Sequence, residues 1–206
     1  MKQLIEEIRH EISLICPQHL EITKKKYATQ KEIRDFEKLS GLTFPEDLVT
    51  FWLHCDFEIT LSTAIYKKLG CEDGPTFFMM DELEYLCEYW KENSGHDFDE
   101  GFDTGPYFGF EGRGYHEKIL TDKVFDRAWF PLSVDSYDGA ICIDLNPGPR
   151  GTHGQLLYMM YIGDGKSGPY YAGFKSIREL LADYLGLLKD RKVEIEEDII
   201  YPPKVF

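Results

Sequence analysis

The chain has 206 residues, of which 43% are hydrophobic and 15% aromatic, and its formal net charge is −14. This length supplies a core without disulfides, and this apolar content excludes a disordered chain. Residues 41–105 carry 15 acidic and 3 basic side chains, so one third of the chain holds most of the excess charge. Such a field repels nucleic acid and anionic membranes and attracts cationic partners, although solubility alone would also explain it.

The compartment is predicted from the apolar runs and the cysteines. No run approaches the roughly 18 apolar residues of a membrane span, and glutamates interrupt the amphipathic N-terminal segment where a signal peptide would be apolar. The five cysteines form no C-x-x-C pair and are odd in number, which is typical of reduced, mostly buried thiols. We therefore expect a cytoplasmic protein without a membrane span. The cysteines are Cys16, Cys55, Cys71, Cys87 and Cys142.

The first half of the sequence predicts helices. Apolar residues at helical spacing indicate a helix over 2–16, which ends where Pro17 follows Cys16. A second helix begins at Thr29, in a T-x-x-E capping box with Glu32, and ends at Gly41. Ile33, Phe36 and Leu39 are predicted to lie on one face of this helix.

Two more helices follow. Pro45 suits the first position of a helix, since its missing N–H costs nothing there. This third helix would bury Leu48, Phe51 and Trp52. Residues 57–80 are typical of short strands and turns. A fourth helix is predicted from Asp81, with a stripe of inner residues and with glutamates facing water; the inner residues are Leu83, Leu86, Cys87 and Trp90. Residues 93–116 suit a long loop or weak strands.

The second half changes to strands. Residues 124–134, 140–145 and 155–162 are rich in β-formers and are separated by turn residues, which predicts antiparallel pairing. Residues 170–174 are a possible further strand. Ser176 and Glu179 then begin a closing helix, whose apolar face holds Ile177, Leu180, Leu181, Tyr184, Leu185 and Leu188. The tail after residue 190 is either an edge strand or irregular. Helices, then a meander, then a helix indicate an α+β fold, with a mainly antiparallel sheet packed by N-terminal helices and a C-terminal helix.

The residues that carry chemistry in other proteins have simpler explanations here. The six histidines form no H-x-x-x-H or Cys/His cluster, so no metal and no cofactor are expected. Asp135, Asp138 and Asp144 could suggest paired carboxylates acting on a sugar, but Asp138-Gly139 is a turn dipeptide and Asp144 lies in a strand. We therefore expect no enzyme; an enzyme acting on carbohydrate remains the weakest of three hypotheses.

Two segments together resemble a known family. IRDFEKLSGLTFPEDLVTFW (residues 33–52) resembles its opening pair of helices around a Phe-Pro turn. WFPLSVDSYDGAICIDLNPGPRGTHGQLLYM (residues 129–159) resembles its central signature, and the helix at 176–189 fits its closing element. The chain is thereby similar to the SUKH superfamily, which takes in fungal regulators of cell-wall glucan synthesis and bacterial immunity proteins that neutralise toxins. The residues that match the signature are Trp129, Pro131, Gly139, Asp144, Leu145, Gly154 and Gln155.

The resemblance implies structural roles for these signature residues and function through protein–protein contact. We expect one SUKH-like domain over 1–206, with a core at about 29–189 and with helix 2–16 and tail 190–206 as extensions. The leading hypothesis is an immunity protein that neutralises a basic toxin domain; the alternative is a regulatory scaffold or adaptor. Neither nucleic acid nor membrane is an expected partner, and the oligomeric state stays open. The predicted partner-binding residues are Glu84, Glu88, Glu92, Asp97, Asp99, Glu100 and Asp103.

Overall fold

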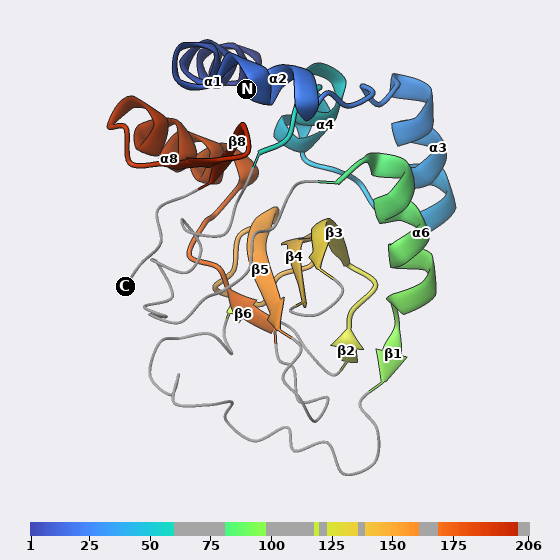
Figure 1. The fold of residues 1–206 in the computed structure, drawn as a ribbon. Helices are drawn as coiled ribbons and strands as arrows, with labels where there is room; N and C mark the ends of the chain where they lie inside the picture. The colour runs from blue at the N-terminus through green and yellow to red at the C-terminus, as the bar shows by residue number, and fades with distance from the viewer. Residues whose placement is uncertain (60–80, 98–117, 120–122, 136–138, 161–168, 202–206) are drawn as a thin grey trace.

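The computed structural model describes residues 1–59, 81–97, 118–119, 123–135, 139–160 and 169–201 (Figure 1). Its helices and strands confirm the α+β class. The helices are α1 (Lys2–Ile15), α2 (Pro17–Ile22), α3 (Gln30–Ser40), α4 (Glu46–His54), α6 (Leu83–Asn93) and α8 (Ile177–Lys189). The strands are β1 (His96–Asp97), β2 (Lys123–Phe125), β3 (Trp129–Asp135), β4 (Gly139–Asp144), β5 (Gln155–Met160), β6 (Pro169–Tyr171), β7 (Glu194–Glu196) and β8 (Ile199–Tyr201).

The central sheet has the order β3-β4-β5-β6, and every neighbouring pair is antiparallel, as predicted. Asp144 at the end of β4 lies opposite both Trp129 on β3 and Gln155 on β5. The register of β3 against β4 shifts between Pro131 and Ser133. Such an irregularity is expected at a proline, which has no N–H to give to the ladder. The two short pairs, β1 with β2 and β7 with β8, form separate sheets.

Helices gather around this sheet in two groups. Figure 1 shows α1, α2, α4 and α8 above one end of the sheet, and α3 and α6 side by side along its flank. α1 packs against α8, and α6 packs against β3. The aromatic centre of the core joins the two groups, because Phe44 of the α3–α4 turn lies within 5.0 Å of Trp52 on α4 and 4.9 Å of Phe130 on β3, centroid to centroid.

The predicted helix ends at Thr29, Gly41 and Ser176 are confirmed. Thr29 accepts a hydrogen bond from the Glu32 N–H, and the Glu32 carboxylate accepts one from the Thr29 N–H at 2.7 Å, which completes the capping box. Gly41 ends α3 with a φ of 74°, a conformation that glycine adopts without strain. The Ser176 side chain accepts from the Glu179 N–H and caps α8.

Two helix starts differ from prediction. Pro45 is the N-cap of α4, not its first residue, because its ψ of 142° is extended. α6 begins at Leu83 rather than near Asp81. Asp81 is instead held by β3: its N–H donates to the Leu132 carbonyl at 3.1 Å, and its carboxylate accepts from the Val134 N–H at 2.9 Å.

The strand predicted over 124–134 is two strands with a turn between them. The Asp126 carboxylate accepts from the Ala128 N–H at 2.7 Å, and this turn separates β2 from β3. α2 was not predicted, although Pro17 at its first position is a start signal. Leu39 belongs to the apolar face predicted for α3, but its side chain is 66% exposed and lines a cavity between α3 and α6.

The tail resolves the alternative left open by the sequence. β7 and β8 pair with each other as a hairpin, and Glu197 and Asp198 at its turn both have positive φ, 51° and 63°. Ile200 of β8 is fully buried, and its N–H donates to His19 of α2 at 3.2 Å. The tail is therefore attached to the N-terminal helices rather than to the edge of the central sheet.

Candidate functional site

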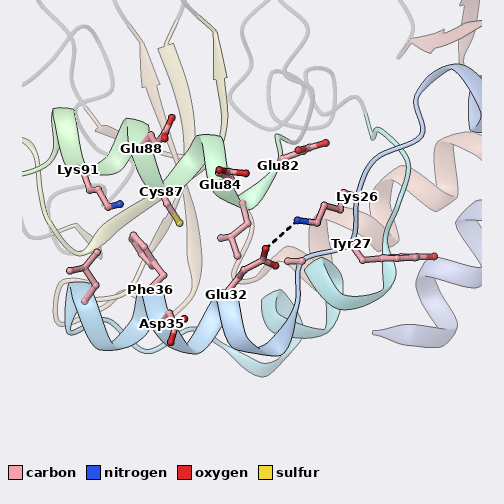
Figure 2. A pocket seen from close by; sticks show the side chains of 13 residues that line it. Lys26, Tyr27, Glu32, Asp35, Phe36, Glu82, Glu84, Cys87, Glu88 and Lys91 are labelled. Carbon is pink, nitrogen blue, oxygen red and sulfur yellow. Dashed lines mark hydrogen bonds and ion pairs between the residues drawn. The ribbon is translucent and has the colours of Figure 1, made fainter.

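A groove of about 380 Å³ runs between α3 and α6 (Figure 2). We call it the α3–α6 groove. α3 forms one wall, α6 forms the other, and residues 26–28 close one end. The described residues that line it are Lys26, Tyr27, Ala28, Glu32, Asp35, Phe36, Leu39, Glu82, Leu83, Glu84, Cys87, Glu88 and Lys91.

The floor of the groove is apolar and rigidly supported. Phe36 and Leu83 are both buried there, and Phe36 makes an edge-on contact with Trp90 at 5.2 Å between ring centroids. Figure 2 shows Phe36 and Cys87 facing each other from the two helices. Leu39 continues the apolar stripe of α3 along the groove, where its side chain is exposed. An incoming apolar side chain would therefore meet carbon atoms that the core already holds in place.

The charges around this floor are mainly negative. Five carboxylates and two lysines line the groove, a net of −3, with Lys26 and Lys91 at opposite ends (Figure 2). Glu32 is paired with Lys26 at 3.2 Å, and the hydrogen bonds from Thr29 lower its pKa to about 2. Asp35 is paired with Lys31 at 2.9 Å. Within the described ranges no basic side chain forms an ion pair with the remaining three carboxylates, which are Glu82, Glu84 and Glu88.

The groove brings together only part of the predicted partner-binding set. Glu84 and Glu88 line it, whereas Glu92 is exposed further along α6. Asp97 belongs to β1, but its side chain lies outside the description, as do residues Asp99, Glu100 and Asp103. Sequence reasoning missed the α3 wall. The sequence explains Glu32 as part of a capping box and Leu39 as part of an apolar helix face, so neither residue indicates a binding surface.

Five of the seven signature residues are buried, and Leu145 is partly buried. Trp129 is fully buried and Pro131 is buried beside it, while Gly139 begins β4. Gly154 has a φ of 86°, and a Cβ there would lie 3.0 Å from the Pro45 ring. Both the backbone conformation and the close approach of α4 therefore favour glycine at this position.

Asp144 and Gln155 connect β4 and β5 to the loops around them. The Gln155 amide donates to the Asp144 carboxylate at 2.9 Å and to the Lys118 carbonyl at 2.8 Å. The Asp144 carboxylate also accepts from the Asn146 N–H at 3.0 Å, and the Gln155 carbonyl oxygen accepts from the Thr152 N–H at 3.1 Å. Burial raises the pKa of Asp144 to about 6, against the lowering effect of these donors. A carboxylate so enclosed ties turns together and does not meet a solvent-borne substrate.

Three of the four described thiols are enclosed by the core. Cys16, Cys55 and Cys142 are buried, and Cys87 is half-buried. Burial raises the pKa of Cys55 and of Cys87 to about 12 and raises that of Cys142 as well. Among the described side chains, no three His, Cys, Asp or Glu are placed to share a metal ion, and no described helix is both long and apolar enough to cross a membrane. Cys71 and Asp138 lie outside the described residues.

An antiparallel sheet flanked by helices, with the Trp129 and Asp144–Gln155 signature at one end of β3, β4 and β5, defines the class of the protein. The family model of the SMI1 / KNR4 family (SUKH-1) matches residues 27–183, about three quarters of the chain. The chain belongs to this family, which confirms the resemblance to the SUKH superfamily. Among curated proteins, none matches the sequence.

Proposed function

We propose that this chain is a non-catalytic protein-binding domain, and that it acts as an immunity protein which neutralises a cognate toxin by covering a basic region of it. The observation that carries the proposal is the row of exposed carboxylates without ion-pair partners among the described residues on α6, at the rim of an apolar groove, in a member of the SUKH family. The buried signature residues support a structural rather than a catalytic role for the most distinctive part of the sequence.

The charge distribution favours a cationic protein partner. The whole chain carries −14, and the α3–α6 groove carries −3 over a short distance. A basic toxin domain approaching such a surface would be steered toward it, which raises the association rate at low salt, where the Debye length exceeds about 10 Å. The same field disfavours nucleic acid, whose phosphates it repels.

The alternative function is a regulatory scaffold or adaptor, of the kind that the fungal members of the superfamily suggest. In that case the partner is an endogenous protein, and the surface would serve equally well. The two functions differ in what loss of the chain does to a cell. An immunity protein is required only when its toxin is present, whereas a scaffold affects growth or cell-wall synthesis by itself.

Co-expression with the products of the flanking genes tests the proposal. One of these products, expressed alone, should arrest growth, and the present chain should restore it. The double variant Glu84→Lys/Glu88→Lys should no longer protect the cells. Its matched control, Glu21→Lys/Asp183→Lys, makes the same charge change at exposed sites away from the groove and should still protect them. If no flanking product is toxic, or if the chain fails to protect against it, the immunity function is wrong.

A further inference from the structure

We infer that the α3–α6 groove is the seat of one particular kind of ligand: a basic, amphipathic helical segment of the partner, which inserts an apolar side chain between Phe36 and Leu39. This inference rests on the proposed protein-binding function and names the partner's chemistry. The evidence for it is an exposed apolar surface and a pattern of charges, and the net acidity of the chain explains neither.

Leu39 is an exposed apolar residue in the lining of the groove. This side chain is 66% exposed although it lies one helical turn from Phe36, which is 5% exposed and belongs to the core. The apolar stripe of α3 therefore runs out of the core and into the groove without a break. The cavity of about 380 Å³ lies near the lower limit of ligand pockets, roughly 300–1,000 Å³, so it accepts a few side chains rather than a folded domain.

The charges define what must flank that apolar side chain. Glu84 and Glu88 are four residues apart on α6, so they lie on the same face of the helix and repel each other. Glu84 gains from its place in the first turn of the helix, but Glu88 is in the middle and has no such compensation. Lysine or arginine side chains of a ligand would relieve this repulsion. Basic residues on one face and apolar residues on the other are the pattern of an amphipathic helix that lies in a groove.

The occupant is thus a protein segment, because the floor needs an apolar side chain and the rim needs several cations at fixed spacing. A simple polycation satisfies the rim alone. A second copy of this chain, whose own groove-facing surface is acidic, would meet like charge. Peptide binding and sedimentation give a different result for each of these alternatives.

The test uses the full chain and a synthetic peptide of about 14 residues, with leucine at i, i+3, i+4 and i+7 and lysine at most other positions. Binding is measured by fluorescence anisotropy of the labelled peptide. Leu39→Ser should weaken binding about five- to tenfold, since it removes part of a leucine contact. Leu14→Ser is the matched control: Leu14 is an equally exposed helical leucine, at 60%, and does not line the groove.

The charge arm uses the same pairs as the protection assay. Glu84→Lys/Glu88→Lys should weaken binding by about tenfold or more and flatten its salt dependence, whereas Glu21→Lys/Asp183→Lys should change it by about twofold or less. Equal losses in the two pairs would mean that only net charge matters, and the inference would be overturned. Equal binding of a peptide with alanine in place of leucine, or an unaltered affinity in Leu39→Ser, would also overturn it.

Self-association separates the remaining case. If sedimentation shows a dimer that Leu39→Ser dissociates, the groove belongs to a second copy and the inference is wrong. The groove and the proposed function fail separately. If the peptide binds at the groove but the chain does not protect cells, the immunity function is wrong and the inference about the groove is kept. If both groove variants, Leu39→Ser and Glu84→Lys/Glu88→Lys, still protect cells, the immunity function is kept and the groove is not the surface that binds the toxin.

Discussion

His19 on α2 connects two segments that are far apart in the sequence. Its Nδ1 accepts a hydrogen bond from the Ile200 N–H at 3.2 Å, and its Nε2 lies 3.1 Å from the Glu58 carbonyl oxygen. A backbone N–H only donates and a carbonyl only accepts, so the proton of the neutral ring is on Nε2. The side chain is fully buried, and burial lowers its pKa.

We expect His19 to make the protein less stable in acid. The pKa of the folded state is below the ordinary value of about 6.5, so the unfolded chain binds the proton first and stability falls as pH drops through and below that value. Protonation would also place a second N–H against the Ile200 N–H. In His19→Asn, urea unfolding at pH 7.5 and 5.5 should show a smaller acid loss than in wild type, by up to about 1.4 kcal/mol per pH unit. The same acid loss in both proteins would contradict this role.

Asp144 has the opposite pH dependence. Its pKa of about 6 is raised above the usual value for aspartate, so its contribution to stability is largest in acid and is lost as pH rises toward and through 6. Gln155→Leu removes a donor that lowers this pKa. We expect it to cost about 1–3 kcal/mol of unfolding free energy at pH 7 and less at pH 5.

The control for that prediction is the Asp144→Asn background, which contains no carboxylate at this position. Gln155→Leu should there cost the same at both pH values. A pH-dependent cost that persists in this background would show that another group titrates, and that the Asp144–Gln155 contact is not its source.

Trp129 tests the core of the signature. Its indole is fully buried and contacts the Phe125 ring at 6.4 Å between centroids, while its N–H has no described partner. Trp129→Ala should destabilise the protein by about 3–5 kcal/mol in denaturant unfolding. Trp129→Phe, which keeps most of the apolar contact and removes the buried N–H, should cost clearly less. Equal losses of unfolding free energy in the two variants would mean that the apolar contact which phenylalanine keeps is not what Trp129 contributes to stability.

Thr29 tests a local signal. Thr29→Ala should cost about 1 kcal/mol, because the Glu32 N–H loses its side-chain acceptor and the Glu32 carboxylate loses the hydroxyl donor, while the bond from the Thr29 N–H can remain. Thr29→Ser keeps the hydroxyl and should stay within a few tenths of wild type. The comparison is made by thermal or urea unfolding at pH 7. A serine variant as unstable as the alanine variant would show that the methyl group, not the cap, stabilises this end of α3.

Much of the fold was predictable because the responsible contacts are local. The capping box joins residues three apart, Gly41 needs only its own φ, and the apolar face of α8 repeats at the helical period. The antiparallel order of β3, β4 and β5 follows from short connections between consecutive strands. Each of these features depends on neighbours within a few residues, which a single sequence displays directly.

The groove and the tail depend on contacts between distant segments. Whether Leu39 is buried or exposed depends on what the rest of the chain packs against α3. Asp81 is hydrogen-bonded to β3 instead of starting α6, because β3 lies within reach of it. The tail hairpin is held against α2 by the hydrogen bond that the Ile200 N–H donates to His19. Local propensity is the same in either outcome; packing partners brought together by the tertiary fold determine which side chains are buried and which remain available to bind.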